Sequence, residues 1–309
     1  MKVTRKSETA LARAERAVAR DISYAHSAAT RGGRTIIRLM ENATGRVSLI
    51  RKARGYEMDV AGGADFWQVI TQRYGMTLDI VGGSLESIPK DGPLIVVANH
   101  PYGILDGLMM GYILSVTRGD FRILAHQVFR KSPDLERVIL PISFDETKEA
   151  AKLNLGTRAE ALRYLKDGGA IGIFPGGTVS TAPKPFGQAL DPKWRSFTSK
   201  MVAHTDATVV PVFFEGANSR LFQLASHLHS TLRMSLLIRE FRARINTPVR
   251  IVVGDPVDPA EIAARKGNPK ELMDFLRKTT YALSPKPMRA DRLGYEFEEK
   301  HKDGGRHLR

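Results

Sequence analysis

Short apolar runs rich in β-branched side chains alternate with amphipathic stretches through the middle of the chain. Such runs predict buried strands, and they occupy residues 76–81, 94–98, 121–125, 137–142, 170–174, 208–214 and 249–253. Helical spacing of apolar residues predicts helices over 65–74, from 105 onward, over 146–166 with a break near Gly156, and over 259–265 and 270–282. Strands that alternate with helices in this way predict one α/β domain over residues 65–283.

Two further stretches, 34–54 and 219–244, are amphipathic and basic. Residues 31–54 hold seven basic residues and one acidic residue. Each stretch either packs on its own domain with a solvated basic face or lies on an anionic bilayer. We therefore expect residues 1–64 to form a helical, candidate membrane-associating extension and residues 284–309 to form a charged, flexible tail. The expected apolar faces consist of Ile36, Met40, Ala43, Val47 and Ile50, and of Leu221, Leu224, Leu228, Leu232 and Leu236.

The composition narrows the partners and the chemistry. The chain of 309 residues has a formal net charge of +14, which favours nucleic acid, an anionic membrane surface or a phosphorylated substrate. Its basic runs lack interleaved aromatic residues and resemble no nucleic-acid-binding motif, so we expect no nucleic-acid partner. The absence of cysteine excludes thiol catalysis, disulfides and Cys-based zinc sites.

The sequence contains neither a candidate membrane span nor a candidate export signal. No apolar run approaches the ~20 residues of a spanning helix, and the N-terminal sequence MKVTRKSETALARAERAV lacks the apolar core of a signal peptide. We therefore expect a cytoplasmic protein, peripheral on the inner face of the membrane. His227 and His229 lie two residues apart in a helical stretch, so their side chains diverge, and we expect no metal site.

The strongest candidate for chemistry follows the strand over 94–98. Asn99-His100-Pro101 ends this strand, and the next helix carries Asp106 in its first turn. A histidine with a free ring nitrogen removes a proton from a hydroxyl or amine, and a nearby carboxylate fixes its tautomer and stabilises the imidazolium. The structural alternative is a turn histidine and a carboxylate that favours the helix N-terminus.

A glycine-rich turn and a basic pair are further candidates for binding. The strand over 170–174 runs into Pro175-Gly176-Gly177-Thr178, where exposed backbone N–H groups hold an anion or a developing oxyanion. The alternative is a plain turn. Arg130 and Lys131 follow the strand over 121–125 and either hold an anionic group or form a solvated basic pair.

Four stretches, in order, resemble one family. NHPYGILDG, FRKSP, IFPGGTVS and VVPVFFEG are similar to the four motifs of the lysophospholipid and glycerolipid acyltransferases, and the resemblance covers about residues 75–260. Two features differ from the usual pattern: five residues separate His100 from Asp106 instead of four, and Gly176 stands where the third motif usually has Glu, with no Arg after Thr178. Both departures resemble the hemolysin-like branch, which includes ornithine-lipid acyltransferases, as do DPKWRSF at 191–197 and residues 216–219.

This resemblance implies a fold and a reaction. The fold is a single α/β domain with a mixed central sheet flanked by helices, beside the N-terminal helical extension. The reaction moves a fatty acyl chain from an acyl carrier protein or coenzyme A thioester to a hydroxyl or amine of a lysolipid, and it uses no other cofactor. His100 is the implied general base, oriented by Asp106; the implied substrate-binding residues are Arg130, Lys131, Gly176, Gly177 and Thr178. The alternative is a non-catalytic protein that binds membrane or lipid through its basic amphipathic helices.

Overall fold

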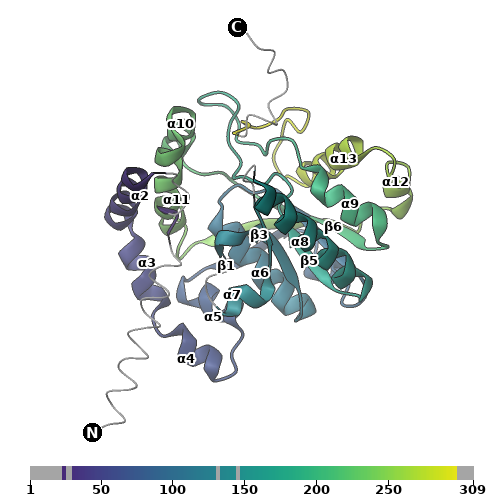
Figure 1. The fold of residues 1–309 in the computed structure, drawn as a ribbon, viewed down its shortest axis with the longest axis horizontal. Coiled ribbons are helices and arrows are strands. Elements are labelled where there is room, and N and C mark those ends of the chain that lie inside the picture. Colours follow the sequence, from purple (N-terminus) through teal and green to yellow (C-terminus); the bar gives the residue numbers. More distant parts are fainter. Residues whose placement is uncertain (1–22, 26–29, 130–132, 144–146, 298–309) are drawn as a thin grey trace.

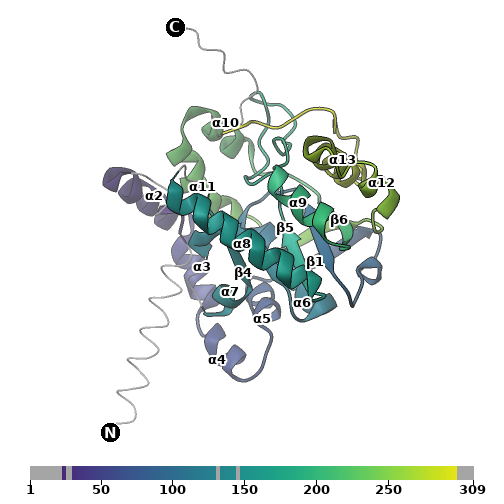
Figure 2. The same ribbon diagram turned by 45° about the vertical axis from the view of Figure 1, so that its right-hand side comes forward.

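A mixed seven-stranded sheet lies at the centre of the computed structural model, with helices on both faces (Figures 1 and 2). The structure describes residues 23–25, 30–129, 133–143 and 147–297. The strand order is β1-β7-β6-β2-β5-β3-β4, and every neighbouring pair is parallel except β6 with β7. The strands are β1 Thr77–Gly82, β2 Leu94–Ala98, β3 Arg122–His126, β4 Ile139–Ile142, β5 Ala170–Ile173, β6 Thr208–Phe214 and β7 Pro248–Val253.

Twelve α-helices and two short 3₁₀ turns are assigned within the described residues, and the helices form two layers over the sheet. One hydrophobic cluster includes side chains of α5, α6 and α11, and the other includes side chains of α8, α9 and α13. The helices are α2 Arg31–Thr44, α3 Arg46–Ala53, α4 Tyr56–Ala61, α5 Phe66–Arg73, α6 Ile104–Arg118, α7 Pro133–Val138, α8 Lys148–Lys166, α9 Ser196–His204, α10 Arg220–Leu228, α11 Ser230–Arg242, α12 Pro259–Ala263 and α13 Pro269–Ala282; the turns are η2 Leu85–Ser87 and η3 Gln127–Phe129.

The position of strand β2 in the sheet explains why residues 94–98 are apolar without a break. Its side chains alternate between the two clusters, with Val96 in one and Ile95 and Val97 in the other. A parallel strand buried on both faces is apolar at every position. β2 pairs in parallel with both β5 and β6, so the loops that follow these three strands meet at one edge of the sheet, where open α/β sheets bind ligands.

The expected helix over 34–54 is divided in two. Gly45 separates α2 from α3 with a φ of 135°, a conformation that favours glycine. The side chains that face the core are not those expected: Ile37 and Leu49 are fully buried, whereas Ile36 and Val47 are each 50% exposed. The expected apolar face is therefore largely on the surface of the protein.

Two other helix expectations were wrong. The stretch 219–244 is broken at His229, whose extended backbone and ring nitrogen cap α11, so the five leucines do not share one face and Leu228 is 75% exposed. In contrast, α8 runs through Gly156 without a break. A glycine in a helix interior costs only about 1 kcal/mol relative to alanine, and the buried Ala161 and Leu165 hold this helix on the sheet.

The segment after α13 was expected to be loose, but its described part is packed on the domain. Glu296 accepts two hydrogen bonds of 2.9 Å from Arg195, and the backbone N–H of Tyr295 donates to the carbonyl of Thr181. Residues 284–297 therefore belong to the folded unit, and 298–309 lie outside the described residues. No helix in the described ranges is long and apolar enough to cross a bilayer.

Candidate active site

The loop after β2 is fixed by the side chain of Asn99. Its amide nitrogen donates to the carbonyl of Phe214 at 2.9 Å, and its amide oxygen accepts from the N–H of Phe214 at 2.7 Å. These two bonds continue the pairing of β2 with β6 by one residue after the strand ends. The next residue, His100, therefore starts from a rigid backbone.

His100 and Asp106 lie together, as the sequence predicted. Nδ1 of His100 is 3.1 Å from Oδ2 of Asp106, a close contact in which the ring N–H is not directed straight at the oxygen. Oδ2 also accepts from the N–H groups of Tyr102 and Gly103, at 2.7 and 2.9 Å. Gly103 has a φ of 89°, so a glycine in the left-handed region absorbs the additional residue between histidine and carboxylate.

Burial and stacking define the environment of this pair. Asp106 is fully buried, and burial raises the pKa of its carboxyl, while the contact with His100 and the two backbone N–H groups oppose that rise. The imidazole stacks on the ring of Phe174, with centroids 4.3 Å apart and planes 28° apart. The ring of His100 is thus held from two sides and stays partly open to solvent.

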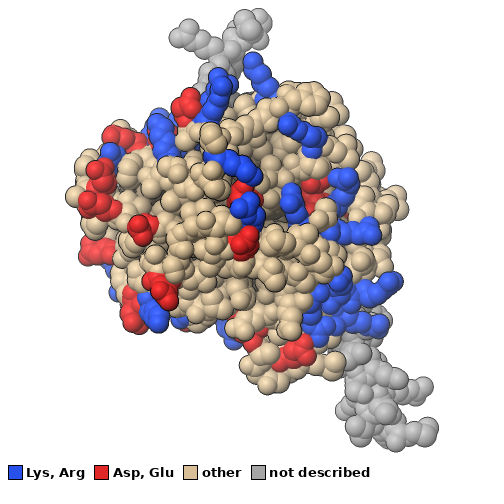
Figure 3. All heavy atoms as spheres, turned by 180° about the vertical axis from the view of Figure 1, so that it is seen from behind, with Lys and Arg blue, Asp and Glu red and all other residues tan. Residues whose placement is uncertain are grey.

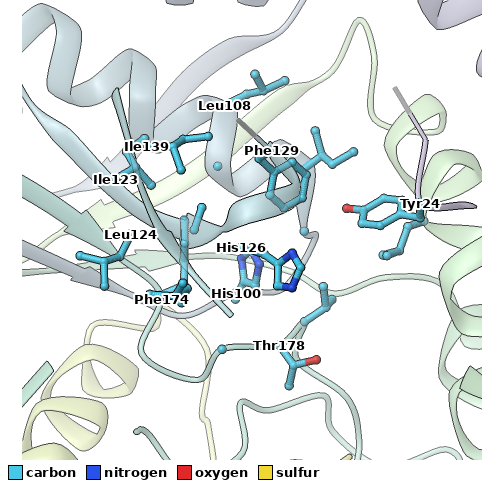
Figure 4. A pocket seen from close by; sticks show the side chains of 18 of the residues that line it. Tyr24, His100, Leu108, Ile123, Leu124, His126, Phe129, Ile139, Phe174 and Thr178 are labelled. Atoms are coloured by element: carbon cyan, nitrogen blue, oxygen red, sulfur yellow. The ribbon is translucent and has the colours of Figure 1, made fainter. Parts of the chain in front are cut away.

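A cavity of about 350 Å³ adjoins His100. Figure 4 shows His100, His126 and Thr178 toward one end of it, with Leu108 and Ile139 farther along. The remaining wall is almost entirely apolar and includes Trp67, Ile123, Leu124, Phe129, Leu135 and Ile142. An apolar pocket with a few convergent polar groups at one end is the usual form of a small-molecule site.

The three candidate residues of the glycine-rich turn, Gly176, Gly177 and Thr178, have different surroundings. Gly177 and Thr178 line the cavity. The N–H of Gly177 donates to the carbonyl of Phe174 at 3.0 Å, so the turn itself uses this amide and it is not free for an oxyanion in this conformation. Gly176 is buried, and its Cα faces the side chain of Asp191.

Arg233 on α11 also lines the cavity and is only 4% exposed. Its Nη2 donates to the hydroxyl of Thr178 at 2.9 Å and to the carbonyl of Val179 at 3.0 Å, and its Nη1 donates to Thr181 and Ser226. Burial lowers the pKa of this guanidinium to about 9. Within the described part of the chain no carboxylate forms an ion pair with it, so a positive charge lies beside the cavity without a counter-ion.

Aromatic rings enclose this cation. The guanidinium carbon of Arg233 lies 3.9 Å from the ring centre of Phe297 and 5.1 Å from that of Phe222. Such cation–π contacts stabilise a desolvated charge. Phe297 belongs to the packed C-terminal segment, so that segment helps to build the polar end of the site.

An N-terminal tyrosine completes the cavity wall. Tyr24 is buried, its ring meets Phe129 edge to face, and burial raises the pKa of its hydroxyl. Glu41 of α2 anchors it: the carboxylate accepts from the backbone N–H of Tyr24 and from the hydroxyl of Ser23, both at 2.6 Å. The sequence analysis expected only a helical extension over residues 1–64 and singled out no contact of Tyr24 with the site.

The basic pair cannot be compared with the prediction, because Arg130 and Lys131 lie outside the described residues. Their described neighbours in the chain do reach the site: Phe129 and Leu135 both line the cavity. Sequence reasoning also missed His126, at the end of β3, whose ring lies at the cavity (Figure 4).

A family model described as "Acyltransferase" matches residues 56–287. The chain belongs to this family. This acyltransferase is 26% identical over 229 residues to a lyso-glycine lipid O-acyltransferase of Phocaeicola vulgatus, covering 72% of this chain and 78% of the relative. It is 25% identical over 229 residues to a lyso-glycine lipid O-acyltransferase of Bacteroides thetaiotaomicron, with 72% and 80% covered.

Among solved structures, the acyltransferase is similar to the 1-acyl-sn-glycerophosphate acyltransferase PlsC of Thermotoga maritima. The two share 19% sequence identity, the alignment covers 82% of this chain and 98% of the other, and the TM-score is 0.46.

Proposed function

We propose that this acyltransferase moves a fatty acyl chain from a thioester, carried by acyl carrier protein or coenzyme A, to a hydroxyl of a lysolipid. The observation that carries the proposal is the position of His100: a histidine backed by a buried carboxylate stands at the polar end of an otherwise apolar cavity of about 350 Å³. The names of the two relatives favour a hydroxyl over an amine as the acceptor group and a lipid as the acceptor.

His100 is the general base of the proposed reaction. Its Nε2 takes the proton of the acceptor hydroxyl as the oxygen attacks the thioester carbonyl. The negative Asp106 beside Nδ1 stabilises the imidazolium that forms. The tetrahedral intermediate collapses, the C–S bond breaks, and the imidazolium returns the proton to the leaving thiolate. Because the chain contains no cysteine, transfer is direct rather than through a thiol acyl-enzyme.

Thr178 and Arg233 support the negative charge of that intermediate. The Thr178 hydroxyl accepts from the Arg233 guanidinium at 2.9 Å, so its own proton remains available as a donor at the cavity that Thr178 lines. A preorganised donor of this kind contributes about 3–4 kcal/mol to a transition state. The sequence favoured the backbone N–H groups around Gly176 and Gly177 for this role, and we assign it instead to the Thr178 hydroxyl because the Gly177 amide is bonded within the turn. Arg130 and Lys131 remain the candidates for an anionic head group or donor phosphate.

The acyl chain occupies the apolar part of the cavity. The wall there is built from β3, β4, α6 and η3, and it includes Leu108, Ile123, Phe129 and Ile139. Burying each methylene of an acyl chain in such a wall yields about 0.8 kcal/mol. The thioester carbon then lies at the end of the pocket beside His100.

A membrane surface is the proposed location of the acceptor. The outer face of α2 exposes Ile36 and Leu39, and the start of α3 exposes Val47. Arg31 and Arg34 are also exposed on α2. Basic side chains also gather over the edge of the molecule where α2 and α3 lie (Figure 3). Apolar and basic side chains on one surface favour an anionic bilayer interface.

The decisive experiment uses purified wild type and His100→Ala with both thioester donors and a panel of lysolipids. Free thiol release and product mass are measured together. Wild type gives one product that gains one acyl chain, and His100→Ala lowers kcat by a factor of about 100 to 10,000.

The matched control is His204→Ala, an exposed histidine at the end of α9, which keeps wild-type activity. Substantial transfer by folded His100→Ala would contradict the base assignment. A wild type that binds lipid vesicles but releases no thiol from either donor would instead support the lipid-binding alternative.

A further inference from the structure

Asp191 is a fully buried carboxylate behind the cavity, and its contacts converge on His100. Its Oδ1 accepts from the backbone N–H of His100 at 3.2 Å and from the hydroxyl of Ser180 at 2.5 Å. Its Oδ2 accepts from the indole N–H of Trp194 at 2.9 Å. Ser180 completes a closed ring, because its own N–H donates to the carbonyl of His100 at 2.7 Å.

The carboxyl group of Asp191 occupies the space next to Gly176. A Cβ atom placed on Gly176 would lie 3.3 Å from each of its three nearest heavy atoms, which are Cβ, Cγ and Oδ2 of Asp191. The backbone of Gly176 does not itself require glycine, unlike that of Gly177, whose φ is 69°. The side chain of Asp191 therefore crowds any side chain at 176, the position where the third motif of the resembled family usually has Glu.

We propose that Asp191 is a positioning residue for His100, and that its carboxylate stands in for the one that this chain lacks at position 176. The inference rests on the proposed function, in which His100 is the base. The hydrogen bonds of Asp191 and Ser180 hold the His100 backbone at both its N–H and its carbonyl. A displacement of about 1 Å in such a group costs about 100-fold in rate.

The backbone of Asp191 is itself fixed by distant elements. Its N–H donates to the hydroxyl of Tyr281 on α13 at 2.7 Å, and its carbonyl accepts from Arg277 at 3.1 Å and from the N–H of Gly294 at 2.8 Å. Burying a carboxylate is unfavourable unless it is hydrogen-bonded. Here the Asp191 carboxylate accepts hydrogen bonds from His100, Ser180 and Trp194. These three bonds offset the cost of burial and hold the carboxylate in one orientation.

The test removes the carboxylate from position 191 and supplies one at position 176. In Asp191→Gly we expect kcat to fall about 100-fold, with KM for the acyl donor unchanged. Adding Gly176→Glu to Asp191→Gly places a carboxylate in the vacated space and restores activity about tenfold or more. Adding Gly176→Gln instead supplies the same size without the charge and restores nothing.

Two controls complete the set. Asp206→Asn, an exposed residue after α9, keeps wild-type activity. Asp191→Asn preserves the side-chain size in case Asp191→Gly fails to fold; it retains one acceptor oxygen and presents an amide to Trp194, so we expect a lower kcat at unchanged KM.

Full kcat in folded Asp191→Gly or Asp191→Asn, or equal rescue by the Glu and Gln additions, would overturn the proposal. His100→Ala separates this result from a failure of the proposed function. An inactive His100→Ala beside a fully active Asp191→Asn rejects the positioning role alone. An active His100→Ala rejects the base assignment and the positioning role that depends on it.

Discussion

At the scale of single residues, the site buries two groups of opposite charge, Asp106 beside His100 and Arg233 beside the cavity. Asp106 has backbone N–H groups and an imidazole as partners. Arg233 has neutral oxygens and aromatic rings instead. In the proposed mechanism the negative charge stabilises the cationic imidazolium and the positive charge stabilises an anionic intermediate, so each has a role that appears only during the reaction.

The ionisation of Asp106 predicts a pH-dependent stability. Burial raises the pKa of Asp106 in the folded state; in the unfolded chain the pKa of an aspartate is about 4. Between these two values the folded state binds more protons, so its free energy of unfolding falls as pH rises. Urea denaturation from pH 4 to 8 should therefore show Asp106→Asn gaining stability relative to wild type as pH increases. The corresponding difference for the exposed Asp206→Asn should stay flat, and a flat Asp106→Asn curve would contradict the raised pKa.

The hydroxyl of Thr178 is predicted to act in the transition state. Thr178→Val keeps the shape of the side chain but removes the hydroxyl donor, so kcat should fall about 100-fold with little change in KM. Thr178→Ser retains the hydroxyl and should restore most of the rate. Steady-state kinetics of both variants, with thermal unfolding as a check on folding, measure the effect. Equal rates for the Val and Ser variants would remove the hydroxyl from the mechanism.

At the scale of elements, helix α2 has two sides with different contacts. Its buried side holds the segment of Ser23 and Tyr24, and its outer side is exposed to solvent. Its buried Glu41 holds Ser23 and Tyr24 against the cavity. Its outer side exposes Ile36 and Leu39 beside basic residues. One helix thus links the wall of the proposed acyl-chain pocket to the surface proposed to meet the bilayer.

The outer side of α2 is predicted to bind anionic vesicles. The double change Ile36→Glu and Leu39→Glu adds negative charge and removes apolar surface, so vesicle co-sedimentation should fall, while turnover of a water-soluble short-chain substrate stays the same. Leu155→Glu on α8, an equally exposed leucine in a different helix, is the matched control and should bind as wild type does. Equal co-sedimentation of the two variants would exclude this face as the docking surface.

At the scale of the whole molecule, the sequence revealed what neighbouring residues determine. The seven strands, the α/β architecture and the proximity of His100 to Asp106 follow from local patterns, whereas the mixed sheet was implied by the family resemblance. The helix break at Gly45 falls on a residue of low helix propensity, whereas the apolar periodicity of 219–244 gave no sign of the cap at His229. Tyr24, Asp191 and Arg233 reach the site from segments far apart in sequence, and a local pattern carries no information about such contacts.

The packed segment 284–297 has a consequence for biosynthesis. Phe297 covers Arg233, and Gly294 holds Asp191, so the proposed site includes groups near both the start and the end of the described residues. A ribosome-bound chain that has exposed the entire sheet still lacks these last contacts. The proposed site is therefore finished only when residue 297 has left the ribosome and can pack on Arg233.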